Sequence, residues 1–368
     1  MFRDGVVKYL YIANELKKKI RDGEYNYGET IPSENELTQV YDVSRHTIRE
    51  AISLLVKENF VRKEKGSGTY VSFNENDVEP SGRKPLNVGV ITTYMSDYIF
   101  PSIIRGIERE LNKENIGLLI SSTHNNYEDE ENALKKMMNN NVDGLIIEPT
   151  KSSSFNPNIN LYLELNAKGI PFIMINSRYS EFESNYVGVD DENSGFIATE
   201  YLIEHGHRNI LAIMKTDDKQ GNDRLKGFVK AHAQHKLSFK NESILTYVTE
   251  EKGSIVERFD EVNFDHFTAV LCYNDEVASQ LSIYLREKNY NVPGDLSLVS
   301  HDNSILSYHS VPPITSVDHP KEELGIQAAK WIASAVKGEE PKLTQKLFKM
   351  SIIEKESVKT LGKENKTE

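Results

Sequence analysis

The N-terminal part of the chain repeats apolar residues at the spacing of amphipathic helices. The pattern predicts a first helix over residues 7–21, with one buried face made of Leu10, Ala13, Leu16 and Ile20. Ser33, with Glu36 three residues later, forms a capping box, which predicts a second, short helix that ends near residue 41. The dipeptide Asp42-Val43 then predicts a tight turn.

A third helix and a glycine-rich hairpin follow this turn. Ser44 is placed to cap the helix, whose apolar set is Ile48, Ala51, Ile52 and Leu55. Two short strands, residues 60–64 and 69–72, flank the sequence Lys65-Gly66-Ser67-Gly68, where glycine permits a tight turn. Three helices followed by such a wing predict a winged helix-turn-helix domain over residues 1–72.

Beyond the wing the pattern changes from helical periodicity to alternating strands and helices. Residues 73–85 are polar and rich in residues that break helices and strands, so we expect a linker there. Val-, Ile- and Leu-rich runs then alternate with helix-patterned stretches, as in βαβ units with parallel sheets. The candidate strands are residues 86–92, 117–121, 142–147, 170–175, 210–214, 269–272 and 296–300. So many elements predict an α/β fold with two doubly wound lobes over residues 86–356.

Length and composition fit a protein of two or three domains. The 368 residues are 38% hydrophobic and 27% charged, as in ordinary globular proteins. The first residues lead into a charged amphipathic stretch instead of a signal peptide, and no apolar run is long enough to span a bilayer. We therefore expect a cytoplasmic protein without a membrane partner. Residues 357–368 predict a polar tail, frayed from Lys359 onward.

The net charge of −12 at first argues against a nucleic-acid partner, but it is unevenly distributed. Residues 1–72 carry 12 Lys and Arg against 11 Asp and Glu, a net +1, whereas residues 73–368 carry 32 against 45, a net −13. Basic residues therefore concentrate in the winged helix, and the acidic remainder repels itself and stays in solution.

The first turn of the third helix carries the chemistry that a recognition helix needs. Arg45, His46, Thr47 and Arg49 face outward there. Arginine pairs bidentately with guanine, Thr and His add hydrogen bonds, and the Ser44 hydroxyl or the helix-start amides can hold a phosphate. Lys65 in the wing can reach a phosphate or the minor groove. A solvated helix face is the alternative for one arginine, but three capped helices and a wing favour DNA binding.

These segments resemble the winged helix of GntR-type regulators. The resemblance rests on Ile31–Leu37, Val43–Ala51 and Gly66–Val71 and covers nearly the whole domain. It implies DNA contacts by Arg45, Arg49 and Gly66. Many members carry arginine where this chain has Asn35, so a hydrogen bond is expected there in place of a phosphate contact. The full predicted DNA-binding set is Ser33, Asn35, Ser44, Arg45, His46, Thr47, Arg49, Lys65, Gly66, Ser67 and Gly68.

The body resembles the effector-binding domain of the LacI/GalR family, itself similar to periplasmic sugar-binding proteins. Its landmarks are Val88–Ile91, Val142–Ile147, His205–Ile210, Arg224–Phe228, Cys272–Ala278 and Val292–Asp302. The combination of a GntR-type DNA-binding domain with a LacI-type body is similar to the arabinose repressor family, especially at Thr92–Pro101 and Glu148–Ser152. This resemblance implies a homodimer that binds a pseudo-palindromic operator and is released from it by a small sugar. L-arabinose is the first candidate for this sugar. Another pentose or hexose, or a purine co-repressor, remains open.

A sugar site needs an aromatic or apolar face for the ring and planar groups for its hydroxyls. Arg224 and Asp302 are the first candidates implied by the resemblance, followed by His124, Asn176, Gln220, Asn274 and His319. Tyr98 or Phe100 can stack on the ring, and Glu148 and Lys151 follow a buried strand end, where an α/β crevice opens.

Each candidate also has an ordinary structural interpretation. The aromatic residues can belong to the core, Lys151 and His319 can be solvated, and Asn274 can do no more than shape its turn. Asp275 is expected to cap a helix.

Other classes of function find less support. His205 and His207 have no third ligand at a suitable spacing, so a helix-end turn is favoured over a metal site. The single cysteine, Cys272, sits in an apolar run and is expected to be a buried strand residue. The sequence has no phosphate-binding loop, dinucleotide fingerprint, nucleophile elbow or zinc-protease motif, which argues against a sugar-processing enzyme and for no cofactor. A periplasmic receptor fits the body but not the winged helix.

Overall fold

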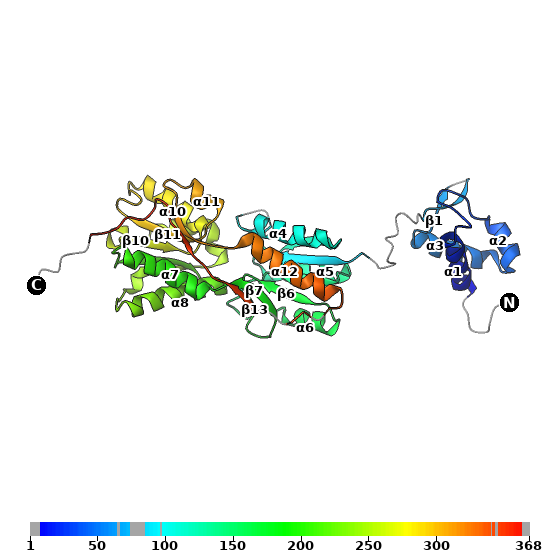
Figure 1. Ribbon diagram of the computed structural model, residues 1–368, viewed down its shortest axis with the longest axis horizontal. Coiled ribbons are helices and arrows are strands. Elements are labelled where there is room, and N and C mark those ends of the chain that lie inside the picture. Colours follow the sequence, from blue (N-terminus) through cyan, green and yellow to red (C-terminus); the bar gives the residue numbers. More distant parts are fainter. Residues whose placement is uncertain are drawn as a thin grey trace, which may run out of the picture. The chain divides into compact units, whose positions relative to one another are not determined.

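The computed structural model describes residues 8–64, 67–73, 85–95, 98–339, 341–342 and 345–362. The chain divides into two units, residues 1–84 and 85–368, which we describe separately and call the head and the body. Figure 1 shows the elements of each. Of the expected linker, only Phe73 and Pro85 are among the described residues.

The head is a three-helix domain with a two-stranded wing. Its elements are α1 (Lys8–Arg21), α2 (Glu34–Tyr41), α3 (Arg45–Lys57), β1 (Val61–Glu64) and β2 (Gly68–Val71), with β1 and β2 antiparallel. The Ser33 hydroxyl accepts a hydrogen bond from the Glu36 amide, and the Glu36 carboxylate accepts one from the Ser33 amide, as the capping box predicts. The Ser44 hydroxyl caps α3 by accepting a hydrogen bond from the Thr47 amide at 3.2 Å.

The head core confirms most of the predicted apolar positions. All four predicted residues of α3 are buried. In α1 the buried set is Ile12, Ala13, Leu16 and Ile20, whereas Leu10 is 39% exposed, so its assignment to the core was wrong. The stripe follows Ile12, Leu16 and Ile20 at intervals of four residues, and Leu10 lies beside it.

The first lobe of the body is a parallel sheet covered on both faces. Strand order is β13-β7-β6-β5-β3-β4. Helices α4 and α12 pack on one face and α5 and α6 on the other, because alternate residues of each strand point to opposite faces. The elements are β3 (Asn87–Thr92), α4 (Phe100–Lys113), β4 (Gly117–Ser122), α5 (Tyr127–Asn139), β5 (Gly144–Ile147), α6 (Ile159–Ala167), β6 (Phe172–Ile175), β7 (Asn185–Val189), α12 (Lys321–Val336) and β13 (Gln345–Phe348).

The second lobe repeats this layered design. Strand order is β14-β12-β11-β10-β8-β9, parallel except for β14, which runs antiparallel to β12. Helices α7 and α8 cover one face and α9 and α10 the other. The elements are α7 (Asp191–Glu204), β8 (Ile210–Lys215), α8 (Lys219–Gln234), β9 (Ile244–Tyr247), η3 (Thr249–Ser254), α9 (Ile255–Phe259), β10 (Ala269–Cys272), α10 (Asp275–Glu287), β11 (Ser297–Asp302), α11 (Ile305–His309), β12 (Thr315–Asp318) and β14 (Ile352–Ile353), with short 3-10 turns at Asn241–Ser243 and Phe264–His266.

The chain passes between the lobes after β7, after β12 and between β13 and β14. Helix α12 therefore follows a strand of the second lobe but packs on the first, against α4. Gly106 and Gly325 allow these two helices to approach: a Cβ on either would lie 2.2 Å from a backbone oxygen of the other helix. The lobes are thus joined by several short segments of the chain.

Each predicted strand is present, but the sequence pattern missed β7, β9, β12, β13 and β14. Cys272 is a buried residue of β10, as expected. The prediction of a polar tail from residue 357 was wrong for residues 357–361. Ser357 is fully buried and donates to the Leu298 carbonyl at 2.6 Å, and the Leu361 amide donates to the His205 carbonyl at 2.8 Å. Backbone and hydroxyl pairing, which hydropathy does not register, holds this segment against the second lobe.

Candidate nucleic-acid interface and ligand cavity

The exposed side of α3 carries three of the predicted DNA-binding side chains. Arg45, His46 and Arg49 are 58%, 82% and 60% exposed. The Ser44 cap fixes where α3 begins and therefore which residues occupy its first turn. This surface combines two guanidinium groups and an imidazole on one helix, a set that can pair with base edges and phosphates.

Glu34, which the sequence interpretation missed, pairs with Arg45 and Arg49 of this surface and with Lys63 of the wing. Its carboxylate accepts hydrogen bonds from Arg49 Nε at 3.0 Å and Lys63 Nζ at 3.0 Å, and Arg45 Nε lies 3.6 Å away. Partial burial tends to raise the pKa of Glu34, but the bonds from Arg49 and Lys63 outweigh burial and hold this pKa below its usual value. The head therefore presents three basic side chains around one carboxylate. Glu34 begins α2, Arg45 and Arg49 lie in α3 and Lys63 lies in the wing, so sequence spacing gave no signal for this cluster.

The other predicted DNA-binding residues surround this surface or lie outside the described residues. Asn35 is exposed on α2, and Thr47 shares a 2.9 Å hydrogen bond between hydroxyls with Ser44. Ser67 is hydrogen-bonded to the Tyr70 hydroxyl, and Gly68 begins β2. The hydroxyls of Ser33 and Ser44 are both used as helix caps. Lys65 and Gly66 fall outside the described residues.

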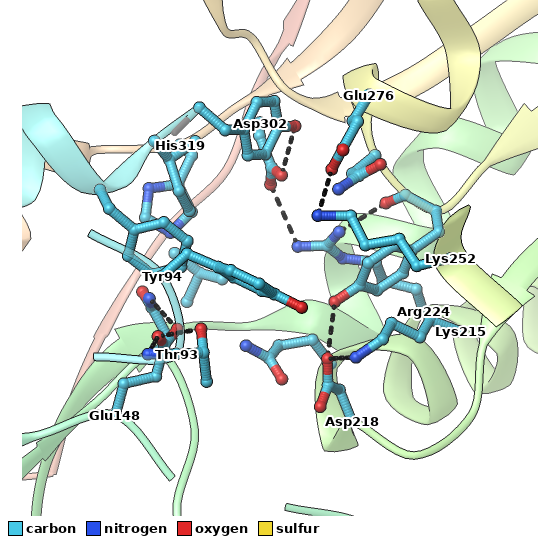
Figure 2. Close-up of a pocket in the computed structure, with 18 of the residues that line it drawn as sticks. Thr93, Tyr94, Glu148, Lys215, Asp218, Arg224, Lys252, Glu276, Asp302 and His319 are labelled. Carbon is cyan, nitrogen blue, oxygen red and sulfur yellow. Dashed lines mark hydrogen bonds and ion pairs between the residues drawn. The ribbon is translucent and has the colours of Figure 1, made fainter. Parts of the chain in front are cut away.

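A cavity lies in the cleft of the body and receives side chains from both lobes. It measures about 830 Å³, its opening to solvent included. Figure 2 shows its polar side chains converging from opposite walls. Of the residues predicted from the sequence, those that line it are Tyr98, Phe100, Glu148, Asn176, Gln220, Arg224, Asn274, Asp302 and His319.

Arg224 is the centre of a buried ionic network in this cavity. Its Nε donates to Asp191 Oδ1 at 2.9 Å, its Nη1 to the Tyr273 carbonyl at 2.6 Å and its Nη2 to Asp302 Oδ1 at 3.3 Å. Burial raises the pKa of Asp191 to about 7, against the opposing effect of the Arg224 guanidinium. Burial would also raise the pKa of Asp302, but Arg224 holds this pKa below its usual value. Asp302 is therefore the ionised carboxylate at this end of the cavity.

Tyr98 joins the first lobe to this network through its hydroxyl. The hydroxyl donates to Asp302 Oδ2 at 2.6 Å and accepts from the Asp275 amide at 3.0 Å. This hydroxyl bond crosses the cleft, and Tyr98 also lines the cavity, so the stacking role of its ring stays a prediction. Phe100 is 7% exposed and belongs to the core of the first lobe, with its ring centroid 6.0 Å from that of Tyr94.

Glu148 forms the opposite end of the cavity. Its Oε2 accepts from the Thr93 amide at 2.8 Å and the Thr93 hydroxyl at 2.5 Å, and its Oε1 accepts from Asn176 Nδ2 at 2.8 Å. Burial raises the pKa of Glu148 despite these bonds. Within the part of the chain that the structure describes, Asn176 Oδ1 and His319 Nδ1 are buried atoms without a hydrogen-bond partner. Burial lowers the pKa of His319 to about 4, so its ring is neutral at pH 7.

Several residues that line the cavity were not predicted from the sequence. Lys215 pairs with Asp217 at 3.2 Å and with Asp218, and Lys252 pairs with Glu276 at 3.0 Å. Lys252 also lies 4.4 Å from the centre of the Tyr94 ring, which comes from the other lobe. Lys215 ends β8 and Asp218 immediately precedes α8, so both lie at the carboxyl end of a parallel strand, the signal that could have found them.

Two predicted ligand residues do not line the cavity. The His124 side chain is 67% exposed and its Nδ1 lies 3.1 Å from Asp129. Lys151 pairs with Glu250 outside the cavity. Both residues have positive φ angles, 48° and 42°. Tyr98, Asn176 and Asp302 have positive φ angles too and line the cavity, so this backbone angle alone does not decide which residues face it.

The predicted cap of α10 is also corrected. Asn274 caps the helix by accepting from the Val277 amide at 3.0 Å. Asp275 instead accepts from the Ser304 amide at 2.5 Å and from the hydroxyls of Ser316 and Ser300.

The two histidines considered as metal ligands lie in the predicted helix-end turn. His205 directly follows α7. His207 is buried, and its two ring nitrogens lie 3.0 Å from the Thr268 hydroxyl and 3.1 Å from the Lys359 carbonyl. Among the helices of the described ranges, none has the length and apolarity that crossing a membrane requires.

A helix-turn-helix head joined in one chain to a two-lobed body with a polar cavity defines a transcription regulator that responds to a small molecule. Two family models agree with these units. Residues 8–71 match the bacterial regulatory proteins of the gntR family, and residues 199–358 match the periplasmic binding protein-like domain.

Proteins of similar sequence identify the kind of transcription regulator. An arabinose metabolism transcriptional repressor of Halalkalibacterium halodurans is 43% identical over 337 residues, 90% of each chain. One of Geobacillus stearothermophilus is 39% identical over 363 residues, 96% of this chain and 98% of that one. The chain therefore belongs to the family of arabinose metabolism transcriptional repressors, and it is a regulator and not an enzyme. The crystal structure of the transcription regulator CcpA of Lactococcus lactis shares the fold, with a TM-score of 0.67 at 23% identity over 75% of this chain and 100% of that one.

Proposed function

We propose that this protein is a cytoplasmic, dimeric repressor that leaves its operator when a neutral monosaccharide, L-arabinose, binds in the cavity between the lobes. The names of the two repressors that it resembles motivate the choice of sugar. The observation that carries the proposal is the cavity, where carboxylates, amides, an imidazole and a guanidinium from both lobes face one small space. The predicted binding residues that line this space are the ones to which we assign ligand contacts.

The unpartnered acceptors favour a ligand that is rich in hydroxyl donors. Asn176 Oδ1 and the neutral His319 ring each offer a lone pair, and Glu148 Oε1 receives only the Asn176 amide among the described residues. A buried acceptor without a partner costs roughly 1–3 kcal/mol, so a hydroxyl that donates to it gains a comparable amount. The rings of Tyr94 and Tyr273, which also line the cavity, supply the apolar surface for a sugar ring.

The charges of the cavity favour a ligand without net charge. Every arginine and lysine that lines it has a carboxylate partner: Arg224 has Asp191 and Asp302, Lys215 has Asp217 and Asp218, and Lys252 has Glu276. A phosphate would compete with these carboxylates for the cations, and separating the buried pairs of Arg224 or Lys215 leaves a carboxylate uncompensated. A free sugar therefore fits better than a sugar phosphate.

A dimer is supported by an exposed apolar patch on the second lobe. Ile283 of α10, Ile305 and Tyr308 of α11, and Val311 are 47%, 60%, 52% and 70% exposed. The Ser282 hydroxyl donates to the Val311 carbonyl at 3.3 Å, which holds this loop beside α10. Large exposed apolar side chains in one region are typical of association surfaces, and a second copy supplies the second head for a two-fold operator. In the head, we assign the DNA contacts to the exposed residues of α3 and the wing.

The favoured direction of control is release by sugar. A ligand changes operator affinity only if it binds one conformation of the body better than the other, and closure of the lobes around a shared ligand provides such a difference. If the closed body does not bind the operator, sugar and operator exclude each other by linkage.

Calorimetric titration with L-arabinose, D-ribose, D-xylose and a purine base tests the ligand. We expect heat of binding with L-arabinose and the weakest response with the purine. Binding of the purine alone would refute the sugar proposal.

A gel-shift titration of the operator complex with the sugar that binds tests the direction of control. Tighter operator binding in the presence of the sugar would show that the sugar is a co-repressor and would refute release by sugar. Replacing Tyr308 by Glu is expected to yield monomers in sedimentation analysis, and an unchanged dimer would remove this patch from the interface.

A further inference from the structure

The two lobes also meet along a rim of the cleft that lies outside the cavity. The first lobe contributes the loops after β4 and β5, with Asn125 and residues 151–153. The second lobe contributes residues 217–222 and the turn at Thr249 and Glu250. Of these residues, only Asp218 and Gln220 line the cavity. The contacts along the rim are therefore largely separate from the groups that face the ligand.

Asn125 makes the most complete contact across this rim. It is 1% exposed, and its Nδ2 donates to Asp218 Oδ1 at 3.1 Å and to Thr249 Oγ1 at 2.6 Å, both in the second lobe. Its Oδ1 accepts from the Lys151 amide of the first lobe at 2.8 Å. Both amide hydrogens thus reach the opposite lobe while the carbonyl is anchored to its own lobe. The φ angle of 56° is one that Asn tolerates better than most residues.

The neighbouring serines extend the same contact. Ser152 Oγ accepts from the Lys219 amide at 2.9 Å, and Ser153 Oγ accepts from Asn222 Nδ2 at 2.7 Å. Lys219 is the first residue of α8, where the backbone amide has no acceptor within the helix. The Ser152 hydroxyl of the opposite lobe therefore satisfies this amide, which makes exchange of the Lys219 amide a reporter of closure.

We propose that the Asn125 amide is a positioning residue for the effector: it raises effector affinity by holding the lobes together and does not touch the ligand. The inference rests on the proposed function, in which groups of both lobes bind one small molecule. Such a ligand needs Glu148 and Asn176 of the first lobe near Arg224 and Asp218 of the second. Apparent affinity is proportional to the fraction of molecules in which these groups are already close, so a bond made only in the closed body increases it.

Two variants, one in each lobe, break this bridge in full or in part. Asn125→Gly deletes the side chain and keeps a residue that accepts a positive φ angle. Thr249→Val deletes the hydroxyl that accepts from Asn125 and donates to Asp217 Oδ2 in its own lobe, and it leaves the bond from Asn125 to Asp218 in place. Asn141→Gly is the matched control, because Asn141 lies in the same lobe, is exposed and has a φ angle of 50°. The measurements are L-arabinose affinity by calorimetry, operator affinity without sugar, the sugar concentration for half-release of operator, melting temperature, and exchange of the Lys219 amide.

Both variants are expected to bind L-arabinose about tenfold more weakly, the effect of losing one or two hydrogen bonds that form only on closure. They need correspondingly more sugar for release, while operator affinity without sugar is unchanged or higher. Their effects are less than additive, because both remove the hydrogen bond between Asn125 and Thr249. The Lys219 amide exchanges faster in both variants and at the native rate in Asn141→Gly. A merely structural defect would instead lower operator affinity and melting temperature together.

The inference and the proposed function fail in different ways. If the native protein binds no sugar, the proposed function fails, and Lys219 exchange alone then decides the role of Asn125. Less than a twofold change in sugar affinity for both variants overturns the inference, provided that the native protein binds. Native Lys219 exchange in Asn125→Gly overturns it whichever ligand binds.

Discussion

Replacing Arg224 by Met tests the buried ionic network most directly. Met preserves most of the length and the apolar packing of the side chain but removes all three hydrogen bonds of the guanidinium. Asp191 and Asp302 then remain buried without their cation. Removing one partner from a buried ion pair costs about 3–5 kcal/mol, so the free energy of unfolding of the body should fall by that amount at pH 8. For a domain of this size, the fall corresponds to a decrease in melting temperature of about 10 °C.

The loss of unfolding free energy in the Arg224→Met variant should be larger at high pH than at low pH. In the variant no guanidinium opposes the effect of burial, so the folded-state pKa values of both carboxyls lie above those of the unfolded chain. Groups with raised folded-state pKa values contribute stability at low pH that is lost as pH rises. The Arg224→Met variant should therefore recover part of its stability at pH 5.5, and Asp191→Asn in the same chain should recover part of it at pH 8.

Scanning calorimetry at pH 8 and pH 5.5, on the native protein, the single variant and the double variant, measures these effects. The transition of the body is followed separately from that of the head, because a chain with two units need not unfold in one step. A loss below about 1 kcal/mol at pH 8, or the same loss at both pH values, would refute the assignment of a charged, partner-dependent network.

Three further predictions concern the head and the native pH profile. Arg45→Ala should weaken operator binding by about 1–3 kcal/mol and change the affinity for scrambled DNA less, as measured by gel shift, and an equal loss on both DNAs would exclude base recognition by Arg45. Glu34→Gln removes the negative charge that Arg49 and Lys63 contact. In a fluorescence anisotropy titration, the affinity for scrambled DNA should therefore rise and should depend more steeply on salt concentration. An unchanged salt dependence would contradict this prediction. Because burial raises the pKa of Asp191 to about 7, the stability that this group contributes is present below about pH 4 and lost as pH rises to 7, and Asp191→Asn should flatten this slope in denaturant unfolding. An identical slope in native protein and variant would assign the pH dependence to other groups.

The head was almost fully predictable because its signals are local. Ser33 with Glu36, and Ser44 with Thr47, interact over three residues, so the sequence contains both partners of each cap in one window. The cluster around Glu34 was not predictable in this way, because Lys63 is 29 positions away and reaches Glu34 only after the wing has folded.

The cavity was predicted in part, and the resemblance to a known family contributed as much as the residue pattern. Asn176, Arg224 and Asp302 do line it, whereas His124 and Lys151 do not. A position beside a strand end is a property of the sequence, but whether its side chain faces the cavity depends on how the following loop folds. Tyr98, Asn176 and Asp302 share the positive φ angles of His124 and Lys151 and yet line the cavity. The strands β7, β9, β12, β13 and β14 were missed for a related reason: they are short and bounded by polar residues, so their identity depends on the neighbour with which they pair.

By itself, the sequence determined the elements whose signals are local: the capped helices of the head, the alternation of strands and helices in the body, and the residue types available for DNA and for a polar ligand. The tertiary structure alone decided which charges meet. The pairing of Arg224 with Asp191 and Asp302, and the bridge from Asn125 to Asp218 and Thr249, join residues 33 to 124 positions apart. Electrostatic and hydrogen-bond energies depend on distances of a few ångströms, and only the packing of two sheets and their crossing segments sets those distances.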